Sequence, residues 1–161
     1  MDRSRSVKVA THADVFDYGL PQPFAGPMVL PSSRNQHWQE IMTSQCLPKD
    51  IKIKPAAGRI RVIFDDAEIA NTTNALELDE PGAPLRLYIP REDVRPDILE
   101  ASSTHTTCPY KGEASYYTIK TLTATGNDGV WYYPNPCALV EPIRDHLAFW
   151  GDKIKFQHDP A

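Results

Sequence analysis

The sequence is poor in cysteine. It has only three, Cys46, Cys108 and Cys137, and no two of them have the Cys-x-x-Cys spacing that is typical of zinc and redox motifs. An odd and sparse set of thiols predicts neither a disulfide framework nor a structural metal site. We therefore expect a protein without a bound metal in a reducing, cytoplasmic compartment.

The sequence also lacks long hydrophobic runs and any bias toward positive charge. No apolar stretch approaches the roughly 20 residues that span a bilayer, and the N-terminus has no apolar segment of the kind found in secretory signals. The formal net charge is −4. Because phosphate binding requires clustered Lys and Arg, we expect no nucleic acid as partner, and we expect no membrane association.

Proline, in contrast, is abundant. The chain has 15 prolines, of which six lie within residues 1–56. Proline lacks an N–H and restricts the residue before it, which discourages long helices and regular sheet. We predict that residues 1–56 form a proline-rich arm that wraps the rest of the protein, with one short helix from Ser33 to Gln45.

Residues 57–161 predict a single domain that is mainly β. Short segments of alternating, β-branched or aromatic residues are typical of strands, and we expect about seven, near residues 59–64, 67–73, 75–78, 85–89, 116–122, 130–133 and 153–156. Val140, Ile143 and Leu147 recur at a helical spacing, so we also expect one helix there. This pattern indicates an antiparallel β domain with one helix in its C-terminal half.

Four ordered motifs resemble a known family, the domain-of-unknown-function 427 family, over about residues 59–156. They are Ile89-Pro90-Arg91-Glu92-Asp93-Val94, Cys108-Pro109-Tyr110-Lys111-Gly112-Glu113-Ala114-Ser115-Tyr116, Val130-Trp131-Tyr132-Tyr133-Pro134-Asn135-Pro136 and His146-Leu147-Ala148-Phe149-Trp150. The resemblance implies a β-tent fold, in which two small antiparallel sheets enclose a ligand-sized cleft. A related fold forms the drug-binding domain of cereblon, with a zinc site that this sequence lacks.

The family is also labelled as a nucleotidyltransferase type, which this sequence does not support. It contains neither a Gly-Ser pair followed by a spaced Asp-x-Asp nor a glycine-rich phosphate loop. Many members have a histidine directly before the motif cysteine, whereas this chain has Thr107 there and carries His105 instead. A mechanism that depends on the adjacent histidine is therefore not expected.

Four residues in or near the second motif are candidates for catalysis. Lys111 can act as a general acid or base, a Schiff-base amine or an anion clamp, or it is simply a surface lysine. Tyr110 offers a phenol beside it. His105 has a pKa suited to proton transfer, but its segment, residues 102–107, has the composition of an exposed loop. Cys108 is a candidate nucleophile, although a small buried hydrophobic residue is the reading that we favour.

Four further residues are candidates for substrate binding. Arg91 can form a fork on a carboxylate or phosphate, or it takes part in a local ion pair. Tyr116, Trp131 and Tyr132 can form an aromatic wall, or they are ordinary sheet core. Since successive side chains in a strand point to opposite faces, Trp131 and Tyr133 are predicted to share one face and Tyr132 to lie on the other.

Three functions are compatible with these residues. The first is a cofactor-independent enzyme that acts on a small organic metabolite by acid–base chemistry, as an isomerase, cyclase or dehydratase. The second is a non-catalytic module that binds a small molecule, an interpretation that depends on fold analogy alone. The third is a protein-interaction module whose arm wraps a partner or a second copy, which includes a possible homodimer. Neither a cofactor nor a metal is expected in any of them.

Overall fold

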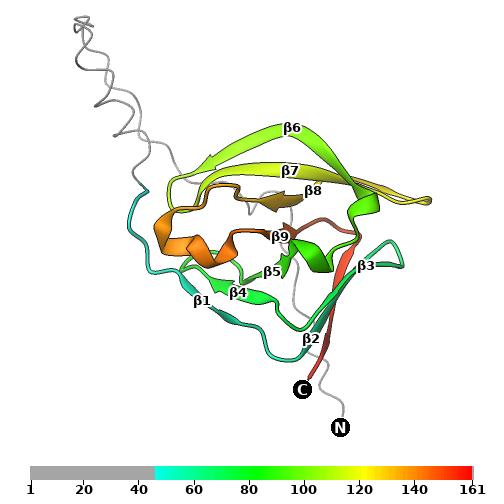
Figure 1. Ribbon diagram of the computed structural model, residues 1–161, viewed down its shortest axis with the longest axis horizontal. Helices are drawn as coiled ribbons and strands as arrows, with labels where there is room; N and C mark the ends of the chain where they lie inside the picture. Colours follow the sequence, from blue (N-terminus) through cyan, green and yellow to red (C-terminus); the bar gives the residue numbers. More distant parts are fainter. Residues whose placement is uncertain (1–45, 161) are drawn as a thin grey trace, which may run out of the picture.

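The computed structural model describes residues 46–160. Their strands are antiparallel throughout and form two sheets. The larger sheet has seven strands in the order β1-β4-β5-β9-β8-β7-β6, and the smaller has three in the order β10-β2-β3. Figure 1 shows β6 and β7 as a long curved pair at the top of the view and the smaller sheet at the lower right. The prediction of a mainly β protein with two antiparallel sheets is confirmed.

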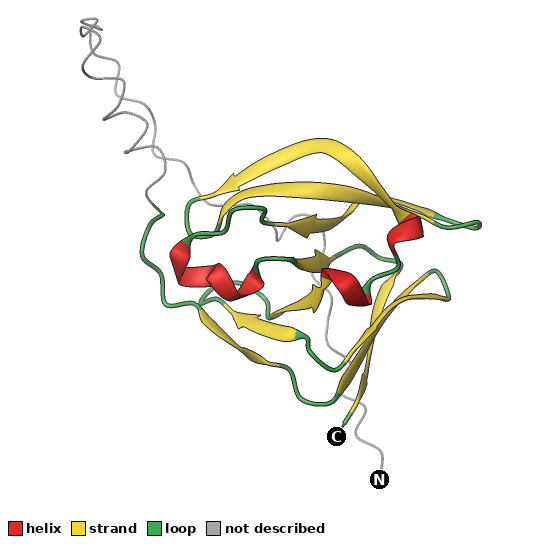
Figure 2. Cartoon of the chain, viewed as in Figure 1, coloured by secondary structure: helices red, strands yellow, loops and turns green. Residues whose placement is uncertain are grey.

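The elements follow one another closely along the chain. The strands are β1 (Lys52–Pro55), β2 (Arg59–Phe64), β3 (Ala67–Thr72), β4 (Leu76–Asp79), β5 (Arg86–Pro90), β6 (Leu99–Cys108), β7 (Gly112–Lys120), β8 (Thr125–Tyr132), β9 (His146–Phe149) and β10 (Ile154–Asp159). Three short 3-10 helices connect them, namely η2 (Arg91–Asp93), η3 (Pro96–Ile98) and η4 (Ala138–Ile143). Figure 2 shows these helices in red.

The helix predicted in the C-terminal half is present only as a short 3-10 helix, and its predicted extension to Leu147 is wrong. Only Ala138–Ile143 is helical, as a 3-10 helix with non-helical torsion angles at Val140 and a proline inside it, Pro142. His146 and Leu147 belong instead to β9, which pairs with β5 and β8. Asp145, with a φ of 59°, lies between the two elements, where a continuous helix would require a negative φ.

The predicted loop over residues 102–107 is also wrong. These residues lie in β6, a ten-residue strand at the edge of the larger sheet, paired with β7. Threonine is β-branched and fits a pleated surface, so a hydroxyl-rich segment pairs as readily as an apolar one. The pairing shifts register between Ala101 and His105, which indicates a bulge in this edge strand.

Most of the predicted arm, residues 1–45 with the helix from Ser33 to Gln45, lies outside the described residues. The last part of the arm is described, and Lys52–Pro55 forms β1, which pairs with β4 at the other edge of the larger sheet. Within residues 46–160, no helix is long and apolar enough to cross a membrane.

The two faces of the larger sheet carry two different cores. Neighbouring residues on one strand face different cores. Val130 and Leu147 face the first core, and the residues after them, Trp131 and Ala148, face the second. The first core lies between the sheets and is mainly aliphatic, with Ile60 of β2 packed in the same cluster. The second core is rich in aromatic and polar side chains, and η4 contributes to it. The strand period of two therefore separates two chemically distinct environments.

Cys46 and Cys137 form a disulfide, which corrects the expectation from the sparse cysteines. Their Cα atoms are 6.0 Å apart although 91 residues separate them along the chain. The spacing of cysteines along the sequence does not reveal a disulfide between residues that come together only in the folded chain. Cys108 is free and buried, which fits the reading that we favoured for it.

Candidate functional site

The turn that joins β6 and β7 carries the central motif, and backbone contacts fix its shape. The Lys111 N–H donates to the Cys108 carbonyl over 3.3 Å. Gly112 follows with a φ of 105°, and a Cβ there would lie 3.0 Å from the Asn135 carbonyl oxygen. A positive φ and a close backbone neighbour both require glycine at this position.

Two further segments hold this turn, one on each side. The Leu47 N–H donates to the Pro109 carbonyl over 2.8 Å, and the Cys137 N–H donates to the Lys111 carbonyl over 3.0 Å. These are the segments that the Cys46–Cys137 disulfide joins. The disulfide and the two backbone hydrogen bonds therefore fix the position of Lys111 relative to the sheet.

The Lys111 side chain points inward and forms a buried ion pair with Glu80, the residue that follows β4. Lys49 binds the second carboxylate oxygen, with 2.6 Å between its Nζ and Oε1 of Glu80. The exposed side-chain fractions are 4% for Glu80, 11% for Lys111 and 18% for Lys49. We call these three residues the ionic cluster, in which one carboxylate serves two ammonium groups.

Burial of these charges is costly. Removing an ion from water costs several kcal/mol in a real protein, and attraction to a partner offsets this only when the geometry is good. Hydrophobic residues of similar volume are often as stabilising as a buried ion pair. Stability alone therefore gives a weak reason for Lys111 and Glu80 to be charged, and this makes them candidates for function.

Aromatic side chains surround the ionic cluster. Lys49 Nζ lies 4.5 Å from the centre of the Tyr110 ring, a distance typical of a cation–π contact. Tyr88 and Trp131 contact edge to face, with ring centres 6.4 Å apart and planes at 79°. They belong to the second core, which we call the phenolic core. Its aromatic members are Tyr88, Tyr110, Tyr116, Trp131, Tyr133 and Trp150.

The buried phenols keep their protons. Burial raises the pKa of Tyr88 and Tyr133, and the negative charge of Glu80 adds to the effect at both. Burial also raises the pKa of Tyr116, although a 2.7 Å hydrogen bond between its hydroxyl and that of Thr106 acts in the opposite direction. The phenolic core thus offers neutral hydroxyl groups around one lysine–glutamate pair.

A second polar group of residues lies on the other face of the same sheet. Nη1 of Arg91, directly after β5, donates to the Tyr117 hydroxyl over 2.8 Å. The guanidinium carbon lies 4.6 Å from the Tyr132 ring centre and 5.3 Å from that of Tyr117. The two tyrosine rings stack at 5.0 Å with 13° between their planes. We call these three half-buried residues the arginine–tyrosine cluster.

The two phenols of this cluster titrate differently. Partial burial by itself raises the pKa of Tyr117, but hydrogen bonds from Tyr132 and Arg91, together with the charge of Arg91, outweigh it, so the net pKa is below the ordinary value. Burial raises the pKa of Tyr132, and its hydrogen bond to Tyr117 raises it further. Tyr117 is thus the more acidic of the two.

A row of hydrogen bonds leads from this cluster toward β6. The Tyr132 hydroxyl interacts with Ser115, and the Ser115 Oγ lies 3.2 Å from Nδ1 of His105. Ser115 is buried, whereas the His105 side chain is 53% exposed, with Glu113 3.9 Å away. The row therefore connects a buried hydroxyl with a histidine at the surface.

The structure divides the candidate residues between the two faces. The alternation predicted for β8 is confirmed, because Trp131 and Tyr133 lie in the phenolic core and Tyr132 lies opposite. The residues at the phenolic core and ionic cluster are Cys108, Tyr110, Lys111, Tyr116 and Trp131. The residues on the other face are Arg91, His105 and Tyr132. The eight candidates thus belong to two places rather than one.

Sequence reasoning missed four residues at these places. Glu80 and Lys49 are the partners of Lys111, but Glu80 lies 31 residues from each of them in the chain, and no local pattern connects them. Tyr88 lies within a predicted strand, where it resembles any core aromatic. Tyr117 had a usable signal, since alternation along β7 places it on the face opposite Tyr116.

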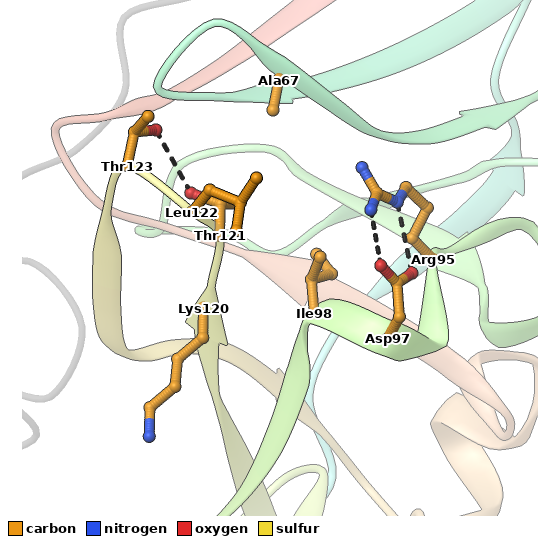
Figure 3. A pocket seen from close by; sticks show the side chains of 8 residues that line it. All are labelled: Ala67, Arg95, Asp97, Ile98, Lys120, Thr121, Leu122 and Thr123. Carbon is orange, nitrogen blue, oxygen red and sulfur yellow. Dashed lines mark hydrogen bonds and ion pairs between the residues drawn. The ribbon is translucent and has the colours of Figure 1, made fainter.

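The surface also has a hollow, shown in Figure 3. Its volume is about 470 Å³, and it is lined by Ala67, Arg95, Asp97, Ile98, Lys120, Thr121, Leu122 and Thr123. None of the candidate residues lines it. Arg95 and Asp97 form an exposed ion pair at its rim. Within residues 46–160, no group of three or more His, Cys, Asp or Glu side chains is placed to hold a metal ion.

Comparison with known families agrees with the motifs. The sequence profile of the family described as domain of unknown function (DUF427) matches residues 52–159, more than half of the chain. The chain belongs to this family. The matched range covers all ten strands of residues 46–160 and includes Glu80 and Lys111, as well as the arginine–tyrosine cluster. A search of curated proteins finds no match. Membership of the DUF427 family brings no activity with it, so function has to be argued from the side chains.

Proposed function

We propose that this DUF427 protein is an enzyme that acts on a small organic molecule by acid–base chemistry, as an isomerase, cyclase or dehydratase, with Lys111 as the group that transfers protons. The observation that carries the proposal is the buried Lys111–Glu80 ion pair beside the phenolic core. A charged pair whose burial brings little net stability is a candidate for function.

Each residue has a role that follows from its contacts. The Lys111 ammonium donates a proton to the substrate, and the resulting amine accepts one back, so one side chain serves both halves of an isomerisation. The Glu80 carboxylate orients the ammonium through the ion pair. The phenols of Tyr110 and Tyr116 supply hydrogen bonds and flat apolar surface. Cys108 fills the core as a buried thiol.

A non-catalytic binding module is the second candidate function. The observation that favours it is the same ion pair, because a lysine already held by a carboxylate makes a rigid contact for a ligand. The two candidates share the binding site and differ only in whether a proton moves. The protein-interaction function and the possible homodimer remain predictions.

A thermal-shift screen tests the shared part of both candidates. We expect some compounds in a panel of small organic metabolites to raise the Tm of the wild type, because a ligand that binds only the folded state stabilises it. Lys111→Arg keeps the positive charge but changes the shape and basicity of the group. The shift should fall in Lys111→Arg and persist in Lys120→Arg, a matched change at an exposed lysine that is paired with Glu100. Compounds whose shift is equal in Lys111→Arg and the wild type would argue against this site.

A further inference from the structure

The arginine–tyrosine cluster contains a cation without an anionic partner. Within residues 46–160, Arg91 forms no ion pair, and its only side-chain hydrogen bond is to a neutral phenol, Tyr117. Three other arginines, Arg61, Arg95 and Arg144, each pair with a carboxylate, whereas the exposed Arg59 binds the amide of Asn71. Arg91 is half-buried, so water screens its charge less than it screens the exposed Arg95 and Arg144.

The tyrosine pair orients the guanidinium. Stacking on Tyr132 and hydrogen bonding to Tyr117 hold the planar group in one place. A guanidinium has five N–H donors, and the bond to Tyr117 uses one of them. The remaining donors form the fork that matches a carboxylate, and because the group is already ordered, a ligand gains its hydrogen bonds at a smaller entropic cost.

The hydroxyl of Tyr117, like the guanidinium of Arg91, has a hydrogen-bond donor that is not used within residues 46–160. Its oxygen accepts hydrogen bonds from Arg91 and from Tyr132. Its own proton has no acceptor among residues 46–160. A polar donor that is partly removed from water without an acceptor costs free energy. Arg91 and Tyr117 therefore present unused N–H and O–H donors side by side.

We propose that Arg91 and Tyr117 form a binding site for a small organic carboxylate, on the face of the larger sheet opposite Lys111. The carboxylate accepts two hydrogen bonds from the guanidinium and one from the Tyr117 hydroxyl. A single positive charge contacts the tyrosine pair, which suits a monoanion. Both tyrosines pack against the apolar first core, which suits a ligand with an apolar body rather than inorganic phosphate.

This site is independent of the proposed acid–base function. Tyr116 and Tyr117 are neighbours on β7 and face opposite cores. A ligand on Arg91 therefore lies across the sheet from the ionic cluster, and Lys111→Arg should leave its binding unchanged. Each proposal can fail while the other survives.

Isothermal titration of the full chain with benzoate tests the site. Benzamide serves as the neutral isostere, and inorganic phosphate serves as the competing anion. We expect saturable binding of benzoate and weaker or undetectable binding of benzamide and phosphate. Because Arg91→Lys keeps the charge but removes the bidentate fork, it should raise the Kd by about tenfold or more. Tyr117→Phe should also weaken binding, and Arg95→Lys, a nearby arginine that is already paired with Asp97, should not.

A spectroscopic readout separates binding from a purely structural role. A carboxylate next to Tyr117 disfavours the phenolate, so saturating benzoate should raise the pH at which the most acidic tyrosine ionises, measured by tyrosinate absorbance. Tyr117→Phe should abolish this shift. The proposal is wrong if benzoate shows no saturable binding, if benzamide binds equally well, or if folded Arg91→Lys binds benzoate like the wild type. Tighter binding of phosphate than of benzoate would overturn the carboxylate assignment.

Discussion

Replacing Glu80 by glutamine should be more destabilising than removing either of its lysine partners. The buried carboxylate binds Lys111 through one oxygen and Lys49 through the other. Glu80→Gln leaves two largely buried ammonium groups around a neutral amide. Breaking a buried ion pair from one side costs about 3–5 kcal/mol, and here the buried Lys111 ammonium loses its carboxylate. For a chain of this size that lowers the Tm by roughly 10 °C or more.

Lys111→Met gives the contrasting result. It removes one ammonium group, while Glu80 keeps Lys49 as a partner. Loss of one charge-assisted hydrogen bond costs about 1.5–3 kcal/mol, and the methionine fills much of the vacated volume. The free energies of unfolding can be compared by urea denaturation followed by circular dichroism, with Lys120→Met as the control, since an exposed pair contributes at most about 1 kcal/mol.

The relative size of the two losses in unfolding free energy tests this reasoning. If Lys111→Met costs as much as Glu80→Gln, the carboxylate does not serve both lysines equally and the reasoning fails. If both changes cost less than about 1 kcal/mol, the ion pair is solvated in solution and the site is more open than the contacts indicate.

Three further predictions follow from other parts of the fold. Burial raises the pKa of Tyr88 and Tyr133, so the stability that depends on these neutral phenols is complete below the ordinary phenol pKa of about 10 and declines above it. Tyrosinate absorbance and circular dichroism should therefore change together in that alkaline range. Ionisation of both phenols without unfolding would contradict their burial. The Cys46–Cys137 disulfide closes a loop of 91 residues, so its reduction should lower the free energy of unfolding by about 4–5 kcal/mol by the chain-entropy relation. The loss can be measured by denaturation in dithiothreitol. An unchanged Tm would refute this prediction. Gly112→Ala should destabilise more than Gly82→Ala in thermal unfolding, because both residues have a positive φ but only Gly112 has a backbone oxygen 3.0 Å from the position of the new Cβ; equal losses would show that this contact relaxes freely.

The strand periodicity of the sequence predicted much of the fold. Alternation along β8 correctly separated Trp131 from Tyr132. The same kind of reasoning failed at Leu147, because apolar residues spaced by three and four also occur where the chain crosses a core as a 3-10 turn followed by a strand. Pro142 was a signal against a regular helix.

The candidate site was less predictable than the fold. Local sequence identified Lys111 as chemically interesting but not its partner, because Glu80 lies 31 residues away along the chain and only the sheet brings the two together. The disulfide was missed for the same reason. A motif shows which side chains are reactive, whereas long-range pairing decides which charges and hydroxyls surround them.

Hydrogen–deuterium exchange into a bound metabolite tests the proposed acid–base function most directly. A compound that raises the Tm of the wild type is incubated with the protein in D₂O, and loss of a carbon-bound proton is followed by ¹H NMR. We predict exchange catalysed by the wild type, slowed by about a hundredfold or more in Lys111→Arg and unchanged in Lys120→Arg. Equal exchange in Lys111→Arg and the wild type would contradict the role of Lys111, and binding without exchange in the wild type would favour the non-catalytic module.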